Sequence, residues 1–320
     1  MKLTAAIKLA FIGLLAAMSF AIRVAAWDDE GHMMVAAIAY DHLNPDVRSR
    51  VDHLLTLNPY YNTWTSMLPQ GISETQRNKM VFMLAATWPD AIKRDNAYQN
   101  DGADNGDRPS GPEASQNIGY SDHLRHKYWH FVDRPFSQDG TALEQPTTPN
   151  AETQIAEFRR ILASGSPDPL KSYDLSWLLH LIGDVHQPLH CASRFSQSEP
   201  HGDAGGNRVK LCAPPCRDEL HAFWDDVLGT SHSPSVALTA AAALHLNNAD
   251  TNAANDTTTG DWIDESFQLA KENVYSGPIG AGDGPFSVTP AYRQSARKIA
   301  ERRVTLAGFR LAAVLNSELR

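Results

Sequence analysis

Two histidine–aspartate pairs have the spacing that places both side chains on one face of a helix. His180 precedes Asp184 by four residues, and His221 precedes Asp225 by the same interval. Side chains so spaced lie one helical turn apart and can reach a common point. His190 follows Asp184 by six residues, just beyond a proline where the chain can bend back. Imidazole nitrogen and carboxylate oxygen are ligands that zinc takes in catalytic sites.

Each pair also has an ordinary interpretation, a histidine hydrogen-bonded to an acid one turn away. Here both pairs fall in apolar surroundings, with Leu179 and Leu181 beside His180 and Phe223 close to Asp225. Because buried charges need partners or a metal ion, this setting favours a metal site. Spacing by itself leaves the hydrogen-bonded alternative open.

Four further residues precede these pairs: Trp27, His32, Asp90 and His130. None is diagnostic alone, because Trp27 could be a core aromatic, His32 a surface residue and Asp90 a turn residue after a proline. Their order along the chain carries more information than their types.

The ordered set resembles the single-strand-specific zinc nuclease family of fungi, plants and bacteria, which is related to the bacterial zinc phospholipases C. Its most specific segments are His186-Gln187-Pro188-Leu189-His190 and Asp203-Ala204-Gly205-Gly206-Asn207. The resemblance runs from Trp27 to the C-terminal segment 307–312 and implies one all-α domain with long loops. It also implies three Zn²⁺ ions as cofactors.

Carried over by position, the resemblance assigns nine metal ligands. The first zinc would take Asp90, His130, His180 and Asp184, and the second would take His190, His221 and Asp225. The third would take the α-amino nitrogen and carbonyl oxygen of Trp27, His32 and the bridging Asp184.

The same carry-over assigns catalytic and substrate-binding residues. Asp133 resembles the carboxylate that orients or deprotonates the attacking water. The family usually has an arginine where this chain has Lys93, with Arg94 beside it; lysine binds phosphate as a point charge rather than a planar fork. Phe131 matches an aromatic that stacks on a nucleobase, with ordinary core packing as its alternative. Asn207 is expected near the nucleotide.

The implied reaction is cleavage of single-stranded DNA and RNA to 5′-phosphorylated products, often with 3′-nucleotidase activity. A zinc-bridging hydroxide would be the nucleophile, because bound zinc lowers the pKa of water from near 16 towards about 7. The remaining zinc, with Lys93 or Arg94, would stabilise charge on the phosphate.

Two alternatives come from other classes of function. A phospholipase C shares the zinc ligands and the N-terminal tryptophan, but Phe131 and the Gly-Gly-Asn segment favour the nuclease. A zinc-storage protein needs no Asp133, since a closed site has no open coordination position.

The elements expected to position these residues are mainly helical. Helices are predicted over 30–42, from Asn44-Pro45, ahead of 80–86 with a Ser73/Gln76 capping box, from Thr148-Pro149, over 172–187, over 218–228 and over 291–315. Residues 95–122 and 247–260, rich in Asp, Asn, Thr or Gly, are predicted to be surface loops.

The first 26 residues are typical of a cleaved signal peptide. Lys2 and Lys8 precede an apolar run, and 24–26 provide the small residues that a signal peptidase needs. Cleavage before Trp27 would free its α-amino group and export the domain 27–320 as a secreted or periplasmic protein. We expect a monomer without stable membrane association.

The charge balance constrains how an anionic substrate is bound. The sequence carries a net charge of −9, and removing residues 1–26 would make it −12, because they contain three basic side chains and no acidic one. A basic nucleic-acid-binding groove is therefore not expected, and bound metal would have to supply local positive charge.

The three cysteines are compatible with disulfide formation in an exported protein. Cys212 and Cys216 flank a Pro-Pro turn and are the closest pair, but the odd count leaves one thiol over and the pairing with Cys191 open.

Overall fold

The computed structural model describes residues 27–101, 114, 116–215, 218–247 and 250–320. The predicted signal peptide, 1–26, lies outside this part of the chain. The α-helices, in order, are α1 Asp29–Asp41, α2 Pro45–Leu55, α3 Tyr61–Ser66, α4 Glu74–Ala85, α5 Trp88–Ile92, α6 Ala151–Leu162, α7 Asp168–Asp184, α8 Leu220–Asp225, α9 Pro234–Ala242, α10 Thr251–Ala254, α11 Thr259–Leu269 and α12 Pro290–Glu318. The predicted mainly helical, single-domain fold is confirmed.

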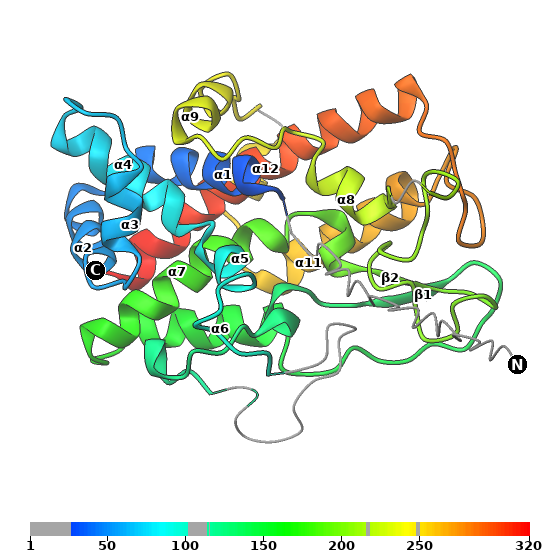
Figure 1. The fold of residues 1–320 in the computed structure, drawn as a ribbon, viewed down its shortest axis with the longest axis horizontal. Helices are drawn as coiled ribbons and strands as arrows, with labels where there is room; N and C mark the ends of the chain where they lie inside the picture. The colour runs from blue at the N-terminus through cyan, green and yellow to red at the C-terminus, as the bar shows by residue number, and fades with distance from the viewer. Residues whose placement is uncertain (1–26, 102–113, 115, 216–217, 248–249) are drawn as a thin grey trace, which may run out of the picture.

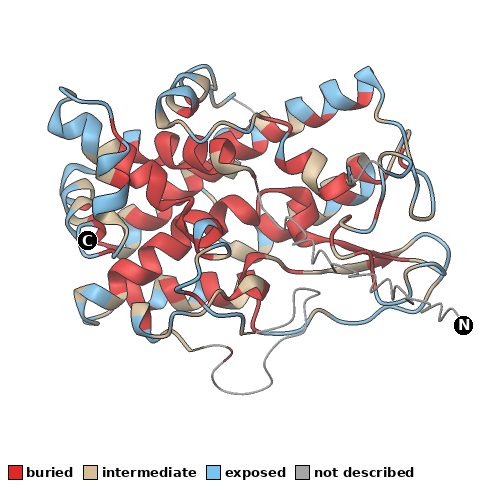
Figure 2. Cartoon of the chain, in the orientation of Figure 1, coloured by how far each residue is buried: buried red, intermediate tan, exposed pale blue. Residues whose placement is uncertain are grey.

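Helix α7 crosses the middle of the molecule (Figure 1). Every residue from Lys171 to Asp184 is buried, and α1, α2, α5, α6 and α12 all contact this helix. A helix that is apolar on all sides requires neighbours on all sides, which explains its central place. Figure 2 shows the resulting buried core along α1, α7 and α12.

Helices α1 and α12 form the most extensive helix pair of the fold. Residues 30–40 of α1 are buried throughout. Gly308 of α12 faces α1 so closely that an added Cβ would lie 2.6 Å from Cβ of Ile38. A side chain at this position would force the two backbones apart.

A short parallel strand pair joins the segment that follows His130 to the segment that follows α7. Strand β1, Pro135–Ser137, pairs with β2, Ser193–Phe195, with Pro135 opposite Ser193. Each strand follows a short 3₁₀ helix that carries a candidate ligand: η3, Lys127–His130, and η4, Pro188–Cys191. The pairing therefore fixes His130 and His190 relative to one another.

Several predicted helix bounds need correction. The helix expected over 172–187 is α7, 168–184, because the residue before Pro188 takes an extended conformation and the helix ends earlier. The helix expected over 218–228 is reduced to Leu220–Asp225, since Glu219 pairs with Lys210 in an isolated β-bridge. The helix expected from Pro149 begins at Ala151, where Asn150 and Thr153 form a capping box.

Residues 247–260 are not wholly a surface loop. They contain α10 and the first two residues of α11, and Asp250, only 2% exposed, binds Arg302 through its carboxylate. The capping box of Ser73 and Gln76 is confirmed. The central part of the predicted loop 95–122, residues 102–113 and 115, lies outside the described residues.

Cys191 is buried and carries a free thiol, which makes it the cysteine left over. Cys216 lies outside the described residues. Among the described residues, no helix has both the length and the apolar character that a bilayer span requires.

Candidate metal centre

The C-terminal half of α7 presents His180 and Asp184 to the same point. His180 Nε2 lies 3.3 Å from Asp184 Oδ2, as expected for residues one turn apart. The other ring nitrogen, Nδ1, donates to the carbonyl of Ala86 at 2.8 Å. This bond places the ring proton on Nδ1 and leaves the Nε2 lone pair directed at Asp184.

Two other elements complete this first group. His130, from η3, brings its Nδ1 to 2.9 Å from His180 Nε2 and 3.0 Å from Asp184 Oδ2. Asp90, from α5, places Oδ1 3.7 Å from His180 Nε2 and 3.9 Å from His130 Nδ1. The four residues predicted for the first zinc are thus brought together.

A second group combines η4 and α8. The Nε2 atoms of His190 and His221 lie 3.2 Å apart, and His221 Nε2 lies 3.5 Å from Asp225 Oδ2. Each Nδ1 donates at 2.7 Å to a backbone carbonyl, that of His130 or of Gly205. With their protons on Nδ1, the two rings direct Nε2 lone pairs towards each other, an arrangement that a cation between them would stabilise.

The Gly-Gly segment explains how His221 is anchored. Gly205 has φ of +61°, and a Cβ there would lie 2.5 Å from the carbonyl oxygen of Leu189. Asp203, buried behind it, accepts from the backbone of Arg194 and from the hydroxyl of Tyr275 at 2.8 Å. The segment therefore supports the ligands, and sequence spacing gave no signal for the role of Asp203.

A third group lies where α1 meets α7. His32 Nε2 is 3.3 Å from Asp184 Oδ1, and its ring stacks on that of His180 with centroids 3.9 Å apart. Trp27 is fully buried, and its indole donates to the carbonyl of Gly183 at 3.1 Å. The backbone N–H of Asp28 donates to the carbonyl of Asp225 at 3.2 Å, so the start of the domain is tied to two ligand-bearing helices.

The donor set fits metal ions. Among the described residues, three groups made up wholly of buried histidine and aspartate have ligand atoms within 4.8 Å of one another: His32, His180 and Asp184; Asp90, His130 and His180; and His190, His221 and Asp225. In the part of the chain that the structure describes, His32 Nε2 and Asp184 Oδ1 are both buried and neither has a hydrogen-bond partner. Since buried polar atoms are normally satisfied, these atoms point to an ion that would bind them.

Burial gives the centre an unusual electrostatic character. It raises the pKa of Asp184 to about 7 and that of Asp225 well above its usual value, and it lowers the pKa of His130 and His190. Neutral imidazole is the form that binds a metal. A bound cation would also stabilise the charged carboxylates and so lower their pKa again.

Asp90 differs from the other carboxylates of the centre. Its burial works to raise the pKa, but the charges of Lys93 and the nearby histidines outweigh it and lower the pKa to about 2. Lys93 Nζ lies 2.6 Å from Asp90 Oδ1, with both side chains only 9% exposed. Arg94 is exposed. Of the two predicted phosphate-binding residues, the structure brings Lys93 to the centre.

The other predicted residues lie on segments next to the ligands. Asp133 and Phe131 are half-buried on either side of Val132, whose N–H donates to the carbonyl of His190 at 2.7 Å. Phe131 also packs against the core, so its core-packing alternative holds for part of the ring. Asn207 donates to the carbonyl of Ala204, while its buried Oδ1 has no hydrogen-bond partner within the described ranges.

One residue of the second group was missed in the sequence. Gln187 donates through Nε2 to Asp225 Oδ1 at 2.7 Å, which orients that carboxylate beside the two histidines. Its place between two candidate ligands, Asp184 and His190, was the available signal.

Comparison with known proteins agrees with this geometry. The family model described as S1/P1 Nuclease matches residues 27–320. Endonuclease 4 of Arabidopsis thaliana is 28% identical over 176 residues, which cover 48% of this chain and 54% of that protein. Endonuclease 2 of the same plant is 26% identical over 52% of this chain and 58% of its own length. Nuclease S1 of Aspergillus oryzae is 28% identical over 44% of this chain and 53% of its own length.

These alignments span about half the length of the curated relatives, whereas the family model covers the whole described domain. The chain belongs to the S1/P1 nuclease family.

Proposed function

We propose that this chain is a zinc-dependent endonuclease that cleaves single-stranded DNA and RNA to 5′-phosphorylated products and also removes 3′-phosphate from nucleotides. The observation that carries the proposal is the anchoring of His180, His190 and His221. Each donates Nδ1–H to a backbone carbonyl and directs Nε2 into a cluster of buried carboxylates. Family membership and the names of the relatives support nucleic acid as the substrate.

The nine ligands would be those assigned by position, with the α-amino group of Trp27 completing the third group. That group becomes available only if the chain is cut before Trp27, so the proposal includes a signal peptide and a secreted or periplasmic enzyme. Zinc bound at these residues would supply Lewis acidity, lowering the pKa of water and offsetting charge on the phosphate.

The protein's own residues would position the reactants. Asp133 would accept the proton of the attacking water. Lys93, held by Asp90, would place a positive charge against the phosphate. Phe131 would stack on a base, which favours unpaired strands and tolerates any sequence, and Asn207 would bind the nucleotide through its amide.

A substrate panel tests this proposal. The purified protein, beginning at Trp27, is assayed on single-stranded DNA, double-stranded DNA, RNA, a 3′-nucleotide and phosphatidylcholine vesicles. We expect hydrolysis of the single strands and the 3′-nucleotide, with 5′-phosphate ends on the products. Hydrolysis of the lipid alone would instead identify a phospholipase C.

Asp133→Asn separates an enzyme from a zinc-storage protein. We expect this variant to lose about 10²- to 10⁴-fold in kcat, the range for loss of a general base, while keeping its zinc content. Unchanged hydrolysis would remove Asp133 from the mechanism.

A further inference from the structure

The turn between Asp184 and His190 links two groups of candidate metal ligands. Side chains from other helices donate hydrogen bonds to two of its carbonyl groups. The carbonyl of Val185 accepts from Ser266 Oγ at 2.6 Å, and that of His186 accepts from Arg303 Nε at 3.2 Å. Carbonyls at the C-terminal end of a helix have no donor within the helix, so external donors decide where such a turn lies.

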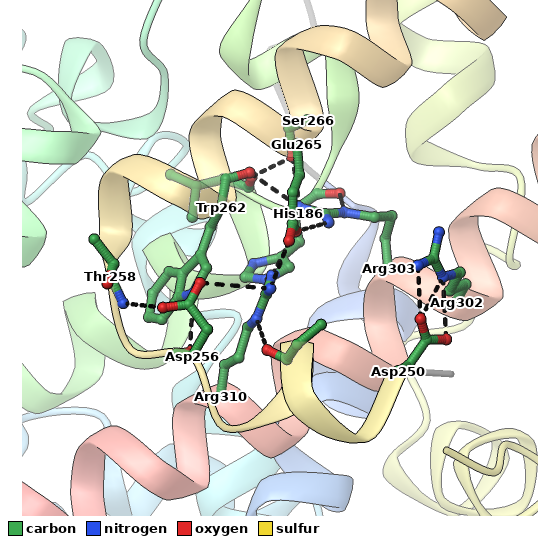
Figure 3. Close-up of polar contacts among 12 residues, drawn as sticks. His186, Asp250, Asp256, Thr258, Trp262, Glu265, Ser266, Arg302, Arg303 and Arg310 are labelled. Carbon is green, nitrogen blue, oxygen red and sulfur yellow. Dashed lines mark hydrogen bonds and ion pairs between the residues drawn. The ribbon is translucent and has the colours of Figure 1, made fainter. Parts of the chain in front are cut away.

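Arg303 is itself held by contacts to four residues (Figure 3). It is 2% exposed, and besides His186 it donates to the carbonyl of Trp262 at 3.1 Å and to Ser266 Oγ at 2.8 Å. Its remaining nitrogen forms an ion pair with Glu265. The planar guanidinium thus joins α11, α12 and the turn with a fixed geometry that lysine lacks.

The side chain of His186 adds a second connection to the same network. Its Nδ1 donates to the carbonyl of Ile182 at 2.7 Å, and its Nε2 accepts from Arg310 at 3.0 Å. Arg310 is fully buried and donates two hydrogen bonds to Glu265, at 2.7 and 2.8 Å. His186 therefore has no lone pair for a metal, although it stands only four residues before a candidate ligand.

We propose that Arg303 and Ser266 are positioning residues for the metal centre: by holding the carbonyls of the turn, they set where His190 stands relative to Asp184. The network contributes no ligand and no contact to the substrate. Its effect reaches the metal through the backbone alone. This inference rests on the ligand assignment of the proposed function.

The chain offers a matched control for each residue. Arg302, next to Arg303 on α12, donates to Asp250 at 3.0 and 2.6 Å, and Figure 3 shows this pair to the right of the contacts of Arg303. Among the described residues, its side chain bonds to Asp250 and not to the turn. Ser176, like Ser266, is a fully buried serine, and its hydroxyl donates to the carbonyl of Ser172 within α7.

The experiment compares Arg303→Met and Ser266→Ala with Arg302→Met and Ser176→Ala, using His190→Ala as the ligand variant. For each, zinc affinity is measured by competition with a chelator, at a temperature where the metal-free protein is folded by circular dichroism. The unfolding temperature of the metal-free protein is measured separately, and Ser266→Ala keeps the test informative if Arg303→Met does not fold.

We expect Arg303→Met and Ser266→Ala to weaken zinc binding by about 10- to 100-fold, the range for residues that orient metal ligands without binding the metal themselves. The controls should change the zinc affinity by less than about threefold. If the two variants lower the unfolding temperature but bind zinc as tightly as the controls do, the network is structural and the inference fails. If His190→Ala also keeps full zinc affinity, the ligand assignment itself is wrong.

Discussion

Histidines only four residues apart in this chain have different roles, and the partner of each ring nitrogen decides which. His190 donates Nδ1–H to a carbonyl and directs Nε2 at His221. His186 donates Nδ1–H to a carbonyl too, but its Nε2 accepts from Arg310. The ring that keeps a lone pair directed at other ligands can bind a metal, and the other cannot.

Sequence spacing located five of the nine assigned ligands and could not locate the rest. His180 and Asp184 share α7, and His221 and Asp225 share α8, so local periodicity brings each pair together. Asp90 and His32 come from α5 and α1, and only tertiary packing places them beside α7. Those two, with Trp27 and His130, could be predicted only through the resemblance.

Lys93 is expected to be the phosphate-binding cation. Lys93→Met should lower kcat by about 10²-fold, typical for loss of one charge-stabilising group, whereas Lys93→Arg should keep most of the activity. Arg94→Met is the matched control, since Arg94 is exposed. Steady-state kinetics on single-stranded DNA measures the difference, and an equal loss in both methionine variants would contradict the assignment.

The α-amino group of Trp27 is expected to bind the third zinc. One extra glycine before Trp27 moves that amine by a residue, so the variant should bind two zinc ions and lose most activity while its circular dichroism is unchanged. Elemental analysis of both proteins makes the comparison. Three zinc ions and full activity in the extended protein would remove the N-terminus from the site.

At the scale of elements, close packing of α1 on α12 holds His32 against α7. Gly308→Ala would place a Cβ 2.6 Å from Ile38. Overpacking costs about 1–3 kcal/mol, of which better helix propensity offsets up to about 1 kcal/mol. The variant should therefore unfold at lower urea concentration than the wild type.

Gly165→Ala serves as its control, because no atom of the described residues lies within 4 Å of a Cβ at that position. Its urea midpoint should match or exceed that of the wild type. Equal midpoints for both alanine variants would show that α1 and α12 tolerate separation.

Helix positions were predictable where a local signal marks the start, and less so where tertiary contacts decide. The Ser73/Gln76 capping box and the proline at the start of α2 gave correct starts. The end of α7 and the shortness of α8 depend on an extended Gln187 and on a β-bridge between Lys210 and Glu219. Neither the extended conformation nor the bridge follows from the periodicity of the helix itself.

At the scale of the whole molecule, the acidic chain surrounds a centre that needs cations. The net charge of −9 leaves little positive potential to attract a polyanion. The described cation closest to the candidate ligands, Lys93, is already paired with Asp90. Three bound zinc ions would bring six positive charges, so the metal would reverse the sign of the potential at the site.

Acid stability should depend on Glu265. Its burial works to raise the pKa, but hydrogen bonds and charges from Arg310 and Arg303 outweigh it and lower the pKa to about 2. A folded-state pKa below the unfolded value of about 4.3 stabilises the fold above that pH, and the contribution is lost as the pH falls towards 2.

Urea unfolding of the metal-free protein measures this contribution. We expect the wild type to be more stable than Glu265→Gln near neutral pH, and the difference to shrink as the pH falls from about 5 to about 3. Metal-free protein is required because zinc is also released in acid. A difference that is independent of pH would show that the charge of Glu265 does not stabilise the fold.

The most direct test of the central claim is the zinc content of the protein beginning at Trp27, followed together with its turnover of single-stranded DNA during stepwise chelation. The account predicts three zinc ions per fully active chain, with activity falling as zinc is removed and returning when zinc is restored. Full activity with fewer than three zinc ions, or activity that persists after complete zinc removal, would contradict it.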